Sequence, residues 1–233
     1  MSPLELALVL FFLLFFSIFS YKKRLLDFEG VLIANAVGLA AITYAPSPLL
    51  CFAVVVVFFV LGEIASNYPR KKHEQRNIWN VVGNSLPALI ILALIVVFPE
   101  LALELQLGFF AAISAALADT LSSEVGYYSK KKPIMITTLK KVPRGTDGAI
   151  TLLGELGALA GAAVIALMYF FSFHSPQDPF FALLILLAGM VGTNMDSVAG
   201  ALFEKKGMLN NTHVNMIGSA SGAIFALALA LLL

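Results

Sequence analysis

The chain alternates between long apolar stretches and short polar loops. Apolar runs cover roughly residues 3–20, 29–45, 48–65, 79–98, 105–125, 147–172, 180–203 and 213–233. About 20 consecutive apolar residues are needed for a helix to cross the hydrocarbon core of a bilayer. The pattern therefore predicts an all-α, polytopic transmembrane helical bundle of about eight spans, or of seven if the short second run does not cross.

The first two loops refine this picture. Pro46-Ser47-Pro48 separates the second run from the third and predicts a tight turn between antiparallel helices. The first run has Glu5 near its start and Lys22, Lys23 and Arg24 after it, whereas a cleaved secretory signal carries its positive charge in front. We therefore expect an uncleaved first span that enters the membrane from outside.

Composition narrows the function classes. Of the 233 residues, 60% are hydrophobic and 12% are charged, whereas soluble domains have about 45–50% apolar and about 25% charged residues. This composition excludes a soluble enzyme and a disordered chain, and a net charge of +1 speaks against a nucleic-acid-binding domain. A single cysteine, Cys51, excludes a disulfide framework and a cysteine-based zinc site.

The basic residues predict the orientation. All 15 Lys and Arg residues lie in the loops after the first, third, fifth and seventh runs, and the alternate loops contain none. Since Lys and Arg are retained on the cytoplasmic side, we expect both termini outside and the basic loops in the cytoplasm, in a multi-pass protein of the cell membrane.

Several acidic residues lie within the apolar runs or at their cytoplasmic ends, where an ionised carboxylate costs about 2.5–3.5 kcal/mol at the bilayer centre. They are Glu63, Asp119, Glu124, Asp147, Glu155 and Asp196. The apolar runs contain no Lys or Arg to pair with them, which leaves a bound cation, a water-filled cleft or protonation. Oxygen ligands suit Mg²⁺ or Mn²⁺, and Asp119, Glu124, Asp147, Glu155 and Asp196 are the candidate metal ligands.

Polar residues repeat at helical spacing on the same side of the membrane. The stripes are Asp147, Thr151 and Glu155 on span six, Arg76, Asn80 and Asn84 on span four, and Asn211, Asn215 and Ser219 on span eight. Spans five and seven end on this side with Asp119-Thr120 and Asp196-Ser197. A single Asn or Ser can equally form an interhelical hydrogen bond, but the set predicts a site where five helix ends converge.

The loop before span six carries cations next to these acids. Lys140, Lys141 and Arg144 lead into Gly145-Thr146-Asp147-Gly148, which we expect to open a helix whose free N–H groups favour phosphate. The Walker pattern is absent. Cations beside carboxylates are typical of a metal–polyphosphate site.

Two motifs carry a family resemblance. Ala118-Asp119-Thr120-Leu121-Ser122-Ser123-Glu124-Val125-Gly126 and Gly145-Thr146-Asp147-Gly148-Ala149-Ile150-Thr151 resemble the integral-membrane family typified by plant phytyl-phosphate kinase, which is distantly like CTP-dependent polyprenol kinases and CDP-lipid synthases. Weaker matches lie at 76–84 and at Asp196-Ser197, Asn211 and Asn215. The family commonly carries a small residue where Asp147 stands.

The resemblance implies transfer of the γ-phosphoryl group of CTP or another nucleoside triphosphate to a prenyl monophosphate, with Mg²⁺ as cofactor and membrane lipids around the site. The implied catalytic residues are Asp119, Glu124, Asp196, Lys140, Lys141 and Arg144. The implied substrate-binding residues are Arg76, Asn80, Asn84, Thr120, Ser123, Gly145, Thr146, Ser197, Asn211 and Asn215.

We expect a single membrane domain over residues 1–233, with peripheral spans at 1–65 and a catalytic core at 70–220. The sequence makes no prediction of an oligomeric state. Two other functions fit the same residues. One is a cytidylyltransferase that makes a CDP-lipid, and the other is an ion or metabolite transporter that uses the buried acids. A transporter often has polar groups that continue past the membrane midplane, and the outer halves of the spans carry few.

Overall fold

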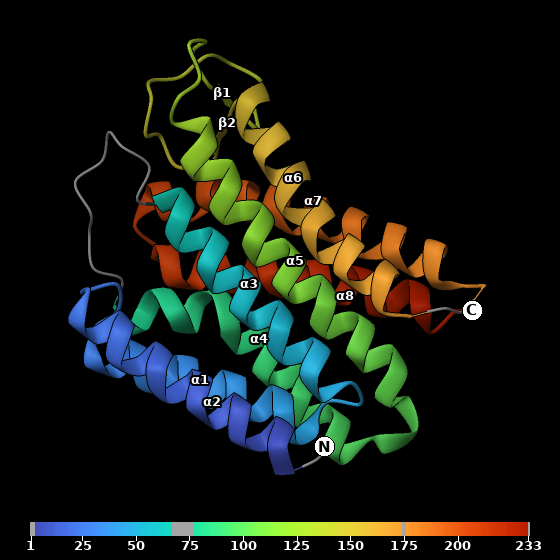
Figure 1. Ribbon diagram of the computed structural model, residues 1–233. Coiled ribbons are helices and arrows are strands. Elements are labelled where there is room, and N and C mark those ends of the chain that lie inside the picture. Colours follow the sequence, from blue (N-terminus) through green and yellow to red (C-terminus); the bar gives the residue numbers. More distant parts are fainter. Residues whose placement is uncertain (1–2, 67–76, 174–175, 233) are drawn as a thin grey trace.

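The computed structural model describes residues 3–66, 77–173 and 176–232 (Figure 1). Within these residues the chain is a bundle of long helices. They are α1 (Pro3–Lys22), α2 (Phe28–Tyr44), α3 (Pro48–Ser66), α4 (Ile78–Val97), α5 (Ala102–Gly126), α6 (Leu152–Ser172), α7 (Asp178–Leu202) and α8 (Asn211–Ala230). Short 3₁₀ turns, η1 (Pro99–Leu101) and η2 (Glu204–Lys206), precede α5 and follow α7. The all-α fold class is confirmed.

Seven of the described helices are long and apolar enough to cross a membrane, and α2, with 17 residues, is shorter. Polar caps fix where several of them begin. Asp27 accepts a hydrogen bond from the Gly30 amide at 2.7 Å, and Asn210 accepts one from the His213 amide at 3.1 Å. Such caps satisfy amide groups that have no partner inside the helix. The helix ends therefore follow the polar residues that flank each apolar run.

The predicted start of the sixth span is wrong. Residues 147–150 are not helical, because Gly145 and Gly148 adopt φ angles of 77° and 73° that turn the chain. Strand β2 (Ala149–Ile150) then pairs antiparallel with β1 (Ile134–Met135). Helix α6 begins only after Thr151, which caps it by accepting from the Gly154 amide at 3.0 Å. Asp147 therefore does not share a helix face with Glu155.

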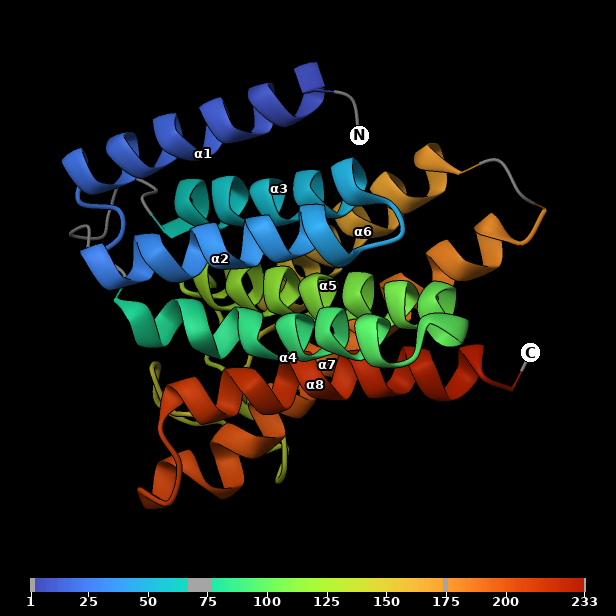
Figure 2. The same cartoon turned by 90° about the horizontal axis from the view of Figure 1, so that it is seen from below.

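The helices run up and down between two ends of the bundle. Figure 2 shows that α1 begins and α8 ends at one end, whereas the α1–α2 turn and the α7–α8 turn lie at the other. The hairpin of β1 and β2 also lies at this second end, and we call it the basic end because it carries Lys22–Arg24, the loop 127–150 and Lys205–Lys206. The structure thus places both helical termini away from the basic loops.

Helix α5 is the centre of the bundle. It packs against α3, α4, α6, α7 and α8. Of its most apolar stretch of 18 residues 78% is buried, whereas the corresponding share of α1 is 17%. Phe109, Phe110 and Leu117 are fully buried on α5. Helix α1 instead packs on α2 and on α3, the latter through edge-to-face contacts such as Phe16 with Phe59. The core that supports any site is therefore built around α5.

Candidate active site

A polar cavity of about 910 Å³ lies where the basic ends of α4, α5, α6, α7 and α8 meet the loop 127–150. We call it the polar cavity. Predicted site residues that line it are Asn80, Asn84, Asp119, Thr120, Ser123, Glu124, Arg144, Gly145, Thr146, Asp147, Asp196, Ser197, Asn211 and Asn215. Residues from separate parts of the sequence are thereby gathered around one space, which is large enough for a nucleotide.

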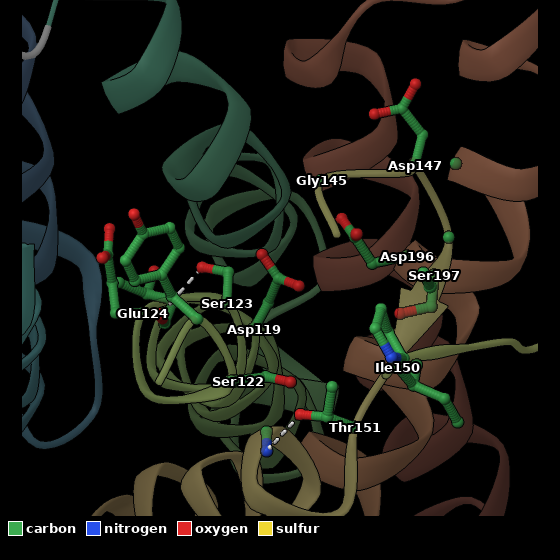
Figure 3. Close-up of a pocket in the computed structure, with 18 of the residues that line it drawn as sticks. Asp119, Ser122, Ser123, Glu124, Gly145, Asp147, Ile150, Thr151, Asp196 and Ser197 are labelled. Atoms are coloured by element: carbon green, nitrogen blue, oxygen red, sulfur yellow. Dashed lines mark hydrogen bonds between the residues drawn. The ribbon is translucent and has the colours of Figure 1, made fainter. Parts of the chain in front are cut away.

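Two carboxylates face each other in this cavity. Asp119 of α5 and Asp196 of α7 extend toward the same space (Figure 3), and each carboxyl group lies within electrostatic reach of the other. Thr193 Oγ1 donates to Asp119 Oδ1 at 3.5 Å. Two carboxylates at this separation repel when both are ionised, so the arrangement favours a cation or a proton between them.

Helix α8 holds Asp196 from the other side. With its amide oriented to satisfy its neighbours, Asn215 donates to Asp196 Oδ2 at 3.2 Å and to the Asn211 carbonyl oxygen at 3.1 Å. A Cβ at Gly218 would lie 2.9 Å from the Asp196 Cβ. The absence of a side chain at Gly218 thus lets α8 approach Asp196 closely enough for Asn215 to reach it.

The loop 127–150 covers the cavity, and it is held by two hydrogen bonds within the loop and by one close contact with α7. Arg144 Nη2 donates to the Ser129 carbonyl oxygen, and Thr146 Oγ1 donates to the Pro143 carbonyl oxygen at 2.8 Å. Gly148 lies against α7, where a Cβ would be 2.4 Å from the Ser197 carbonyl oxygen. The sequence predicted that the Gly145–Gly148 turn opens a helix, and this prediction is wrong. The turn instead folds over the cavity and brings Arg144 to its wall.

Some predicted residues lie elsewhere. Lys140 and Lys141 are exposed and do not line the polar cavity. Glu155 lies outside it as well, and its Oε2 accepts from Asn194 Nδ2 at 3.4 Å. Arg76 lies outside the described residues. The predicted roles of Lys140, Lys141 and Glu155 therefore have no counterpart in the cavity geometry.

Two charged residues that the sequence does not single out also line the cavity. Lys131 belongs to a run of three lysines that the positive-inside rule explains without function. Glu204, in η2, lies within electrostatic reach of Asp119, Asp196 and Asp147. The sequence feature that could have identified Glu204 is its position eight residues after Asp196. This spacing is about two helical turns.

The described residues contain no group of three or more His, Cys, Asp or Glu side chains arranged to enclose a metal ion. Mg²⁺ in nucleotide-binding sites is usually held by one or two carboxylates, with substrate phosphates and water as the other ligands. The Asp119–Asp196 pair fits this kind of site. A shared site of protein and substrate ligands is therefore the form of metal binding that the geometry supports.

Comparison with known proteins identifies a family and several relatives that match most of the chain. The integral membrane protein family DUF92 matches residues 11–223. An uncharacterized membrane protein of Methanocaldococcus jannaschii, MJ0933, is 36% identical over 210 residues, which are 87% of this chain and 85% of that protein. A second, sll0875 of Synechocystis, is also 36% identical over 191 residues, 76% of this chain and 73% of the relative.

A plant relative is more distant. Protein VTE6, chloroplastic, of Arabidopsis thaliana is 30% identical over 215 residues, which are 84% of this chain and 63% of the plant protein. No solved structure matches the chain significantly. The family resemblance drawn from the two sequence motifs is confirmed, and the chain belongs to the integral membrane protein family DUF92.

Proposed function

We propose that this protein is a prenyl-phosphate kinase, which transfers the γ-phosphoryl group of CTP or another nucleoside triphosphate to a prenyl monophosphate. The observation that carries the proposal is the polar cavity at the basic end, in which Asp119 and Asp196 converge from two helices. The family resemblance supplies the reaction class, because it links these same motifs to phytyl-phosphate kinase.

Charge neutralisation is the main task of such a site, since phosphoryl transfer depends on positioning and electrostatic stabilisation. Asp119 and Asp196 would hold Mg²⁺, which would supply positive charge to neutralise the phosphates. Arg144 and Lys131 line the same cavity and would bind phosphate oxygens directly. Glu124, also in the wall, would bind the metal's water ligands or the nucleotide.

The acceptor makes a general base unnecessary. A prenyl monophosphate is already ionised near neutral pH, so one of its oxygens can attack the γ-phosphorus directly. The new P–O bond forms as the bond between the γ-phosphorus and the β–γ bridging oxygen breaks, and the nucleoside diphosphate leaves with that electron pair. The site thus needs to align two phosphates, for which Asn80 and Asn84 supply hydrogen-bond donors at the wall.

The position of the cavity suits one water-soluble and one lipid substrate. It opens at the basic end, which the distribution of Lys and Arg predicts to face the cytoplasm. Nucleotide would enter from that side, whereas the prenyl chain would remain among the helices. This arrangement lets a lipid phosphate meet a soluble donor without leaving the membrane.

The direct test is a product assay. Protein purified in detergent would be incubated with Mg²⁺, γ-³²P-labelled CTP, UTP, GTP or ATP, and phytyl or geranylgeranyl monophosphate. We expect labelled prenyl diphosphate, and we expect Asp119→Asn to lower the rate at least 100-fold. Glu104→Gln, at the opposite end of the same helix, is the matched control and should retain activity. Inactivity on the whole panel, or release of pyrophosphate in place of nucleoside diphosphate, would overturn the kinase assignment.

A further inference from the structure

A second cavity lies beside the polar one, among α2, α3, α4 and α5. Helix α2 packs against α3 and α4, and α5 packs against the same two helices from the other side (Figure 2). The space between these helices is small, about 40 Å³ by the same measure that gives about 910 Å³ for the polar cavity. The lining residues are Leu26, Ala34, Val37, Val55, Phe58, Phe59, Asn80, Val81, Asn84, Ser85 and Ile113. We call this space the apolar cavity.

The walls of the apolar cavity suit a hydrocarbon chain. Apart from Asn80, Asn84 and Ser85, every lining residue is aliphatic or aromatic. Ser85 Oγ donates to the Val81 carbonyl oxygen at 2.7 Å, so its hydroxyl group is satisfied within α4. An apolar ligand would therefore leave no buried polar group of Ser85 without a partner.

The two polar residues that remain mark the junction of the two cavities. Asn80 and Asn84 line both the polar and the apolar cavity. Asn80 Oδ1 accepts from the Asn77 amide at 3.0 Å in a capping box at the start of α4. The part of the Asn80 carboxamide left to a ligand is therefore its NH₂ group, which donates hydrogen bonds and suits a phosphate oxygen.

We propose that the apolar cavity binds the first isoprene unit of the acceptor, with the phosphate of the same molecule at Asn80 and Asn84 on the edge of the polar cavity. This inference rests on the proposed function and names the path of the lipid. One occupant with a charged head and an apolar chain matches two adjoining cavities that share two amide side chains in their walls. Ile113 precedes Asp119 by six residues of α5, so the chain would descend about 9 Å below the carboxylate pair.

Photocrosslinking tests the path without requiring turnover. The probe is geranylgeranyl monophosphate with a diazirine on its first isoprene unit, added to the full chain in nanodiscs. We expect label on the peptides that carry Phe58 and Phe59 or Val81, and we expect unlabelled geranylgeranyl monophosphate to compete. Equal label on the lipid-exposed residues of α1, or equal competition by a phospholipid, would overturn the proposal.

Two substitutions on one helix make the kinetic test specific. Ala34→Phe fills the apolar cavity, whereas Ala36→Phe places the same side chain on an exposed face of α2. We expect Ala34→Phe to lower crosslinking at least fivefold and to raise the KM for geranylgeranyl monophosphate at least tenfold, with the KM for CTP changed less than twofold. Ala36→Phe should match the wild type. Ala34→Leu, a smaller intrusion, gives the same comparison if Ala34→Phe does not fold.

The outcomes separate this inference from the reaction itself. Specific label in the apolar cavity without diphosphate formation would support the lipid path and contradict the kinase proposal. Diphosphate formation with an unchanged KM in Ala34→Phe would support the kinase and contradict the path.

Discussion

Gly148 of the covering loop lies directly against Ser197 of α7, so that a Cβ at position 148 would be 2.4 Å from the Ser197 carbonyl oxygen. Ser197 follows Asp196, one of the two facing carboxylates. The loop that carries Arg144 is thereby fixed to the helix that carries Asp196. Close contact between the backbones at Gly148 and Ser197 sets the distance between the Arg144 guanidinium and the Asp196 carboxylate across the polar cavity.

We predict that Gly148→Ala releases this loop from α7. The new methyl group meets backbone atoms that cannot move aside, and the left-handed conformation of residue 148 adds about 1–2 kcal/mol of strain for any L side chain. Amide hydrogen exchange of residues 134–150 should accelerate, and kcat/KM for phosphoryl transfer should fall at least tenfold.

Gly145 supplies the control for this prediction. Its φ of 77° is as strained for an L residue as that of Gly148, but a Cβ there would meet no atom within 4 Å. Gly145→Ala should therefore show only the strain, about 1–2 kcal/mol, with slow exchange retained in the loop. Equal acceleration of exchange in both variants would contradict the docking role of Gly148.

Substitution of Asp196 and substitution of Asp147 should differ in their effect on the Mg²⁺ dependence of the reaction. Asp196→Asn removes one of the facing pair, and we expect the rate at saturating substrate to fall about 100-fold, or about 2.7 kcal/mol, with a higher Mg²⁺ concentration needed for half the maximal rate. Asp147→Ala, on the exposed turn, should change the rate less than threefold. Mg²⁺ titration of both variants measures this, and a similar response would contradict the assignment of the metal to Asp119 and Asp196.

Local sequence information predicted the helices well but not the loop. Apolar length and flanking polar residues gave the ends of most spans to within about three residues, because hydropathy and capping act locally. The start of α6 at Leu152 instead depends on two glycines with positive φ and on the pairing of β2 with β1, which is distant in sequence. Hydropathy carries no information on that pairing, so Asp147 was wrongly placed on the helix.

The candidate site shows the same division. Asp119 and Asp196 stand out in the sequence because a carboxylate in an apolar helix needs a partner. Lys131 and Glu204 do not stand out, since charged residues in loops are ordinary, and only the folded loop and η2 bring them to the cavity wall. Glu155 has the same sequence signal as Asp119, yet its partner is Asn194. Which face a polar residue occupies is decided by packing between helices.

Lys131 and Lys140 offer a test of which loop cations contact phosphate. Lys131 lines the polar cavity, whereas Lys140 is exposed outside it. We expect Lys131→Ala to raise the KM for the nucleotide about tenfold, since a hydrogen bond to a charged group contributes about 1.5–3 kcal/mol. Lys140→Ala should change that KM less than twofold. The reverse order of effects would support the cation assignment made from the sequence.

A final prediction concerns the packing that positions Asp196. Gly192 lies one helical turn before Asp196, and a Cβ there would be 2.3 Å from the Ala115 Cβ and 2.8 Å from the Gly218 carbonyl oxygen. Gly192→Ala should therefore separate α7 from α5 and α8, with a loss of about 1–3 kcal/mol typical of overpacking. Gly38→Ala is the control, because the atoms nearest to a Cβ there belong to the side chains of Leu13 and Phe52, at 3.2 Å.

The double variant Gly192→Ala with Ala115→Gly distinguishes this clash from a general intolerance of substitution. Removing the Ala115 methyl group eliminates one of the two close contacts, so part of the lost thermal stability should return, and the coupling energy between the two positions should be favourable. Melting temperatures in detergent measure the stability, and the same samples assayed for phosphoryl transfer report whether Asp196 returns to its place. If the double variant is less stable than either single one, the close approach of α5 and α7 is not what Gly192 provides.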